Sequence, residues 1–320
     1  MYKSTKKAFS LLELVFVIVI LGIVASIGSS VIVKVYESYL VQRAVHRASL
    51  KTELAVNILA NRLAYRIDTS LIAHNPGNFG AGDMLPLRGL PTANANTHTA
   101  LEWIGYENDG FSTTTPPAWS GFVDLTHANT DFNGFETPAS QLLLENTILG
   151  HLFQNMGNPA MIFRAQNYHN NLGGDTPYDA NCMHRINNVP GCMFPLGFNP
   201  NATTFAFAAV GNPDRAIGMM LYTEHYQLAA SAYAVVPEPD AGRRTPNNTL
   251  VWDLFFYSDY QPWERALPED YRDGVKTLLL PNVSVFRFTQ EANSIRIKIC
   301  SIESIEGTDI SICKEKAVIR

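Results

Sequence analysis

One carboxylate stands alone inside the longest apolar run of the sequence. Glu13 is the only charged residue among the 25 residues 9–33. The chemistry open to it is ion pairing, because an ionised side chain on a helix in lipid costs about 2.5 to 3.5 kcal/mol. The run contains no cation, so a partner within the chain at helical spacing would be Lys6, Lys7 or an amino terminus newly created at Phe9.

The four cysteines are the other residues whose spacing could do chemistry. They fall as two local pairs, Cys182 with Cys192 and Cys300 with Cys313. All four follow the apolar run, on the side that the topology below places in an oxidising compartment, where disulfides persist. Two local disulfides are expected, each contributing about 3 kcal/mol through its effect on the unfolded chain. Cross-pairing stays open at the level of the sequence.

Other ligand and catalytic patterns are weaker. His184 lies near Cys182, but the cysteine pair is not CxxC and His169, the nearest other histidine, has no ligand spacing. Two acidic turns, residues 107–110 and 131–134, offer oxygens to calcium, yet neither matches an EF-hand loop and simple turns need no ion. The sequence has no GxSxG, HExxH, P-loop or GxGxxG motif, so no metal, cofactor or catalytic site is predicted.

The apolar run around Glu13 is long enough to cross a membrane. As a helix its 25 residues span about 37 Å, more than the roughly 30 Å of bilayer hydrocarbon. Lys3, Lys6 and Lys7 precede it and place the start of the chain in the cytoplasm, so everything after Val33 lies outside. The run is longer than the apolar core of a secretory signal and continues into a helical pattern, so we expect it to be retained.

The first residues resemble a known processing signal. Residues 6–15 read KKA-FSLLELV and continue into the apolar run, a pattern similar to the class III signal of type IV pilins and type II secretion pseudopilins. In that family a prepilin peptidase cuts before the phenylalanine and the new amine is methylated. The resemblance implies cleavage between Ala8 and Phe9, methylation of Phe9, and pairing of Glu13 with the free amine of a neighbouring subunit in a filament.

Two positions depart from the family pattern. Ala8 stands where the family usually has glycine before the cut, and Ser30 lies near the place of the proline that major pilins carry in the membrane helix. Gly28, Ser29 and Ser30 are expected to loosen the helix in its place. Glu13 also separates the chain from the K-type tip subunit, which typically lacks that acid.

The helical pattern continues outside the membrane. No proline occurs before Pro76, and one apolar stripe of 3.6-residue periodicity predicts a single helix from Phe9 to about Ile67, about 87 Å long. The stripe comprises Val41, Ala44, Val45, Ala48, Ala55, Ile58, Leu59 and Leu63. On or beside its polar face lie Arg43, Arg47, Arg62 and Arg66. Solvation of these arginines is expected, and pairing with acidic neighbours in a filament is the alternative.

This interpretation divides the chain into four segments. They are a cytoplasmic leader (1–8), a transmembrane half-helix (9–33), a periplasmic amphipathic half-helix (34–67) and a periplasmic head (68–320). Residues 75–248 of the head are rich in Asn, Thr, Gly and Pro, which is typical of large loop-rich insertions.

The central region still predicts some regular structure. A helix is expected with Thr137 as its cap, Pro138 in its first turn and Gly157 at its end. Its apolar positions are Leu142, Leu149, Leu152, Phe153 and Met156. Short apolar runs predict strands at 160–163, 203–210, 230–236 and 250–257. Core packing or loop anchoring, rather than an exposed binding surface, is expected for Trp103, Trp119, Trp252 and Trp263.

The last 45 residues give the clearest strand pattern. Residues 295–299 alternate strictly, with one apolar and one basic face, and the runs 278–288, 310–313 and 317–319 complete an antiparallel meander. A long amino-terminal helix with a carboxy-terminal antiparallel sheet from about residue 275 is the α+β, pilin-like architecture, in agreement with the resemblance. The run 280–288 also weakly resembles the end of J-type minor pseudopilins or W-type minor pilins.

Charge separates the same segments and bears on partners. The net charge of -5 is a sum of +5 over residues 1–51, -12 over 52–275 and +2 over 276–320. No nucleic-acid partner is therefore predicted for the bulk of the chain. We expect a minor, non-catalytic subunit of a type II secretion or type IV pilus filament in the inner membrane and periplasm. Its partners would be other such subunits, prepilin peptidase and the secretion or pilus assembly machinery.

Two other functions stay open at the level of the sequence. One is a minor pilin of a surface fibre for adhesion, motility or DNA uptake. The other is a membrane-anchored periplasmic binding protein or enzyme that works alone.

Overall fold

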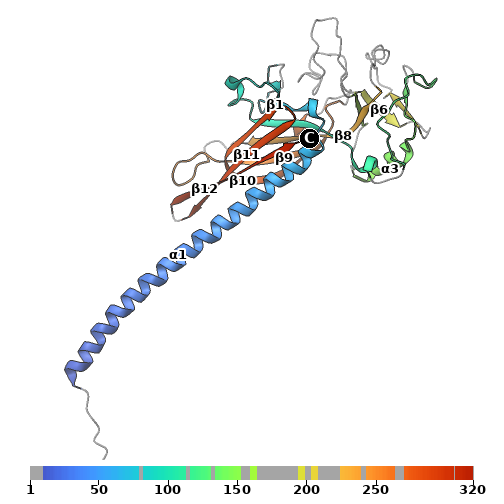
Figure 1. The fold of residues 1–320 in the computed structure, drawn as a ribbon. Helices are drawn as coiled ribbons and strands as arrows, with labels where there is room; N and C mark the ends of the chain where they lie inside the picture. The colour runs from blue at the N-terminus through green and yellow to red at the C-terminus, as the bar shows by residue number, and fades with distance from the viewer. Residues whose placement is uncertain are drawn as a thin grey trace, which may run out of the picture.

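The computed structural model shows two parts, one long helix and a head built on an antiparallel sheet (Figure 1). The head comprises every element after Ala64. The structure describes residues 10–78, 82–112, 116–130, 134–152, 159–163, 194–198, 203–207, 224–238, 243–263, 270–305 and 307–319.

The long helix predicted from the sequence is present and continuous. Helix α1 (Leu11–Ala64) has 54 residues and is about 80 Å long. Ser10 caps its start, because the serine hydroxyl accepts a hydrogen bond from the N–H of Leu12 (3.3 Å). The helix is unbroken at Gly28 and Ser30, where loosening was expected. The Ser30 hydroxyl donates to a backbone carbonyl three residues earlier (2.8 Å), so its polar group is satisfied within the helix.

The end of α1 packs lengthwise on the sheet, against β10, β11 and β12 (Figure 1). Its buried residues are Ala48, Thr52, Ala55, Val56, Leu59, Ala60 and Leu63. Three of the seven are alanines, which let the helix backbone come close to the strands. The predicted stripe is confirmed at four positions. Val41 is 39% exposed, and Ala44 and Val45 are half-buried. Ile58 is 37% exposed because the buried face is centred on the side of Val56 and Ala60.

The antiparallel sheet predicted for the end of the chain is confirmed. Three long strands form a meander: β10 (Val275–Glu291), β11 (Ser294–Ile305) and β12 (Thr308–Ile319). Ile295, Ile297 and Ile299 are fully buried in the cluster that includes α1, while Arg296 and Lys298 alternate with them and are exposed. The alternation seen in the sequence therefore corresponds to a helix-covered face and a solvent face.

The sheet continues beyond these three strands. Its order in the described residues is β12-β11-β10-β9-β8-β5-β6-β7-β4, with β3 paired to β8 and to β1, and β2 paired to β1. All of these neighbours are antiparallel. The bounds are β1 (Ile72–His74), β2 (Met84–Pro86), β3 (Ala100–Tyr106), β4 (Gly134–Glu136), β5 (Ala160–Phe163), β6 (Phe194–Phe198), β7 (Thr204–Phe207), β8 (Tyr226–Glu238) and β9 (Trp252–Tyr260). Short 3-10 helices lie at Asp68–Ser70, Thr92–Asn94 and Tyr271–Asp273.

Alternate residues of β3 enter different clusters, which shows that both faces of the sheet are covered. Leu101 and Trp103 belong to the cluster with α1, whereas Ala100 and Ile104 belong to a second cluster that includes Trp263. Three of the four tryptophans are buried as expected, and Trp252 is partly buried against the first cluster.

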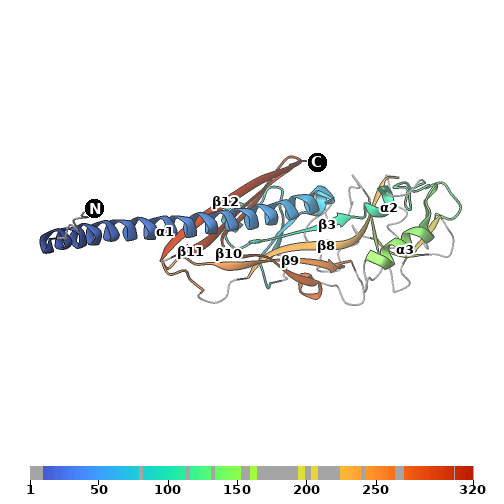
Figure 2. The same ribbon diagram turned by 90° about the horizontal axis from the view of Figure 1, so that it is seen from below.

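A third hydrophobic cluster forms a separate lobe, which we call the distal lobe. It consists of α2 (Asp109–Ser112), α3 (Leu142–Leu152), β4, β6 and β7, packed on the adjoining residues of β5 and β8. Figure 2 shows α2 and α3 at the end of the molecule farthest from the start of α1.

The predicted beginning of α3 is wrong. The helix starts at Leu142, and Thr137 donates its hydroxyl to the carbonyl of Thr203 (2.8 Å) instead of capping the helix. Ala139 has a left-handed backbone (φ 61°), which interrupts helical geometry before Leu142. The expected positions Phe153, Met156 and Gly157 lie outside the described residues.

Arg66 is not solvated, contrary to expectation. Its side chain is fully buried just after α1 and donates to the carbonyls of Leu63 (2.9 Å) and Asn293 (2.8 Å) and to the carboxylate of Asp68 (3.1 Å). Asn293 belongs to the turn between β10 and β11, so one guanidinium joins the end of the helix to the sheet. Arg43, Arg47 and Arg62 are exposed.

A polar contact inside the helix–sheet interface is open to a direct test. The hydroxyls of Thr52 and Ser301 are hydrogen-bonded (2.7 Å), and both residues are buried. Thr52→Val should destabilise the head by about 1 to 2 kcal/mol in denaturant unfolding of the detergent-solubilised protein, because the isosteric change leaves Ser301 with one partner fewer. The control is Thr147→Val on α3, whose exposed hydroxyl bonds only within its helix. Equal effects of the two variants would contradict the prediction.

Candidate functional site

The amino-terminal end of α1 carries Glu13, the lone carboxylate of the apolar run. Glu13 lies in the first turn of the helix, and its backbone N–H bonds to the carbonyl of Ser10 (3.0 Å). The backbone N–H groups of the first turn point away from the helix body and give this end of a helix a partial positive charge, so a carboxylate is favourable there even before it meets a partner. Glu13 is exposed, which leaves its side chain accessible to a group from another molecule.

The first half of α1 extends away from the part of the head that the structure describes (Figure 1). Residues 11–33 are all exposed, and Leu11 and Ile32 reach 82% and 70%. Within the described residues, α1 is the one helix long and apolar enough to cross a membrane, with a mean hydropathy of 2.8 over its most apolar 18 residues. Exposure of so much apolar surface to water is unfavourable, so this half of the helix requires a lipid or protein environment.

Several of the predicted site residues lie outside the described residues. They are the cleavage-site residues Ala8 and Phe9 and the first cysteine pair, Cys182 and Cys192. His169 and His184 lie there too, as do residues 131–133 of the second acidic turn. Their roles stay predictions.

The second cysteine pair is joined. Cys300 on β11 and Cys313 on β12 face each other in the strand register and form a disulfide. This link closes the hairpin that packs on α1 and so restrains the surface on which the helix rests.

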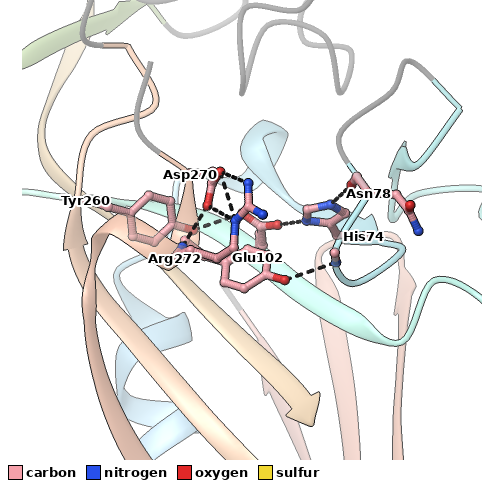
Figure 3. Close-up of polar contacts among 8 residues, drawn as sticks. His74, Asn78, Glu102, Tyr260, Asp270 and Arg272 are labelled. Atoms are coloured by element: carbon pink, nitrogen blue, oxygen red, sulfur yellow. Dashed lines mark hydrogen bonds and ion pairs between the residues drawn. The ribbon is translucent and has the colours of Figure 1, made fainter. Parts of the chain in front are cut away.

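A buried polar network lies on the face of the sheet opposite α1. His74 (β1), Glu102 (β3) and Tyr260 (β9) are all fully buried. Figure 3 shows the His74 ring between Glu102 and the backbone of Asn78. The imidazole Nδ1 contacts Glu102 Oε1, its Nε2 contacts the Asn78 carbonyl, and Tyr260 donates to Glu102 Oε2 (2.9 Å). Both ring nitrogens therefore face oxygen acceptors, an arrangement that favours a doubly protonated, charged histidine.

Electrostatics agree with this protonation. Burial lowers the pKa of His74, but the hydrogen bond and charge of Glu102, helped by Asn78 and Asp270, outweigh it and raise the pKa overall. Burial and Glu102 together raise the pKa of Tyr260 far above its usual value, so its hydroxyl stays a donor. The network joins three strands to the turn after β1, which is a structural role.

The first acidic turn is satisfied by its own backbone and by the indole of Trp119. Glu107 Oε1 accepts from the N–H groups of Asp109 (2.6 Å) and Gly110 (2.9 Å), and Oε2 accepts from the indole of Trp119 (2.8 Å). In the parts of the chain that the structure describes, no group of three or more His, Cys, Asp or Glu side chains is placed to hold a metal ion.

Comparison with known proteins supports the amino-terminal signal. Residues 3–29 match the family model of the prokaryotic N-terminal methylation motif. Together with the long apolar helix, this match fits a class III prepilin-like pilin or pseudopilin, a structural class whose members assemble with one another. No curated protein and no solved structure matches the chain.

Sequence reasoning missed the buried polar residues, although a signal for them exists. Glu102 interrupts the apolar run ALEWIGY, and Glu145 shares a helix face with Leu142 and Leu149. A charged residue at a position where its neighbours predict burial indicates a polar network inside the fold.

Proposed function

We propose that this chain is a minor subunit of a type II secretion or type IV pilus filament and works by assembly rather than catalysis. The main support is the combination of the amino-terminal motif with the shape of the helix that follows it. The methylation motif at residues 3–29 opens a continuous helix whose first half is exposed and apolar and whose second half is fixed to a head. The first half suits the lipid before assembly and a bundle of similar helices afterwards, while the head contacts neighbouring subunits or cargo.

The proposal assigns a sequence of steps to the amino terminus. The leader lies in the cytoplasm and the head in the periplasm. Prepilin peptidase cuts between Ala8 and Phe9, and the new amine is methylated. Glu13 then pairs with the amine of a neighbouring subunit, which sets the register of one helix against the next. A disulfide between Cys182 and Cys192 is proposed alongside the one observed.

The role of Glu13 is tested by Glu13→Ala. We expect the variant to reach the membrane normally but to fall at least tenfold in sheared filament fractions, because a carboxylate–amine pair inside an apolar bundle has no substitute partner. Quantitative immunoblotting of membrane and filament fractions measures both. Glu37→Ala, an exposed acid on the same helix, is the control and should behave as wild type. Normal incorporation of Glu13→Ala would remove the register role.

The processing steps are tested separately by mass spectrometry of the mature amino terminus. A methylated Phe9 supports the filament subunit. An intact Met1 would point to a membrane-anchored protein that works alone, and would contradict the proposal regardless of how Glu13 behaves. Co-purification of partner subunits then distinguishes a secretion filament from a pilus.

A further inference from the structure

A carboxylate of the distal lobe is buried without a partner. Glu145, on the inner face of α3, is fully buried, and neither of its side-chain oxygens has a hydrogen-bond donor in the described residues. Leu142 and Leu149, on the same helix face, are also fully buried. An ionised carboxylate in such surroundings is strongly unfavourable, so this group needs either a cation or a proton.

The group that faces Glu145 is a second carboxylate. Glu107, directly after β3, is only 6% exposed. A Cβ added at Gly110 would lie 1.8 Å from Glu145 Oε2 and 2.9 Å from Glu107 Oε2, so both carboxyl groups converge on this glycine. Gly110 has no Cβ, and this absence lets α3 come close to the segment that follows β3.

The charges around the pair are mainly acidic. Glu107 and Asp109 face Glu145 from the segment after β3, and β6, the strand that α3 contacts, carries no charged residue. Across an adjoining cavity of about 440 Å³ lie Arg62 and Asp259. Burial first, and then Glu107 and Asp109, raise the pKa of Glu145 to about 9.

The geometry favours a proton over a metal ion. Backbone and indole N–H groups donate to both oxygens of Glu107, so these oxygens serve as acceptors and positive partial charges lie where a cation would sit. A protonated Glu145 becomes a donor to Glu107 and satisfies both groups at once.

We propose that Glu145 and Glu107 share one proton, and that this proton acts as a latch holding α3 of the distal lobe onto the segment after β3. Loss of the proton to solvent leaves two buried carboxylates facing each other. The latch therefore weakens as pH rises, and α3 opens before the rest of the head. Such a device makes the outer surface of the distal lobe responsive to pH while the helix–sheet part stays folded.

Hydrogen exchange of the α3 amides tests the latch in the full-length protein in detergent, read by mass spectrometry between pH 6 and 8 and corrected for intrinsic exchange. The pKa of Glu145 is raised in the closed state, so the open state binds fewer protons than the closed state. High pH therefore favours opening. Wild-type α3 should lose protection by about tenfold per pH unit, the change expected for one proton. Glu145→Gln, which keeps the shape of the protonated acid, should show no such slope. Glu224→Gln, an exposed acid, should match wild type.

Three outcomes would overturn the latch. The first is a flat wild-type series, which needs no variant and so stands even where Glu145→Gln does not fold. The second is an unchanged slope in Glu145→Gln. The third is a change in α3 protection at pH 7 between calcium chloride and EDTA, which would assign the site to a metal ion. The test does not depend on filament assembly.

Discussion

Arg66→Ala is expected to lower the Tm of the solubilised protein by roughly 6 to 12 °C, a loss of about 3 kcal/mol. The change removes the side-chain donor to the carbonyls of Leu63 and Asn293 and the only cation beside Asp68 in the contacts described. Burial lowers the pKa of Arg66 and Asp68 opposes this, so the guanidinium depends on the partners that hold it. Arg66→Lys should recover part of the loss, since one ammonium cannot reach all three acceptors.

The matched control is an arginine that contacts the same turn of the sheet. Arg88 is exposed and donates to the carbonyl of Ala292 (3.2 Å), next to the carbonyl that Arg66 contacts. Arg88→Ala should change the free energy of unfolding by no more than about 0.5 kcal/mol. If differential scanning fluorimetry gave the two alanine variants similar Tm values, burial of Arg66 would not be the source of its effect.

Glu102→Gln is expected to have the second large effect, about 3 kcal/mol at pH 6, because buried His74 must then either stay charged without its carboxylate or give up its proton. The three side chains concerned, His74, Glu102 and Tyr260, are fully buried, so water cannot replace the lost partner. The loss should also depend on pH in a way that cavity formation would not produce. Chemical denaturation of wild type and variant from pH 5 to 8 measures both.

The sign of the pH dependence follows from the raised pKa of His74. In wild type the stability from the charged pair is complete below the unfolded pKa of about 6.5 and is lost as pH rises through the folded pKa. In Glu102→Gln burial dominates and lowers the pKa of His74. Protonation of His74 then opposes folding, so the stability of the variant falls as pH drops below about 6.5. Glu145 is present in both proteins, so the difference between them isolates His74. His46→Gln, at an exposed position, should follow wild type, and parallel curves for Glu102→Gln and wild type would contradict the assignment.

The elements governed by local pattern were predictable. A 3.6-residue stripe and the absence of proline before Pro76 predicted α1 to within a few residues of its observed bounds, Leu11–Ala64. Strict alternation at residues 295–299 predicted β11 and its helix-covered face. Each pattern lies within a single helix or strand and arises because one face of that element is buried, so it can be read without knowing the neighbouring elements.

Contacts between distant segments were not predictable in the same way. Arg66 meets the carbonyl of Asn293, 227 residues later, and Tyr260 meets Glu102 across 158 residues. Periodicity identifies the face of an element but not the element that covers it, so an arginine at the edge of a helical stripe was assigned to solvent. The beginning of α3 failed for a related reason, since Thr137 finds a tertiary partner in Thr203 that competes with local capping.

The lengthwise contact between α1 and the strands also decides how the protein carries force. A pull on the free half of α1 acts along the helix axis, and β10–β12 lie against its other half, so the load falls on the interface in shear. Under shear, all the buried contacts between α1 and the strands resist the load together. Peeling the helix away would break these contacts one after another. Arg66 anchors the far end of the helix, and the Cys300–Cys313 bond keeps the supporting hairpin from opening under the same load. The interface is therefore expected to resist a pull along the axis of α1 better than a pull across it.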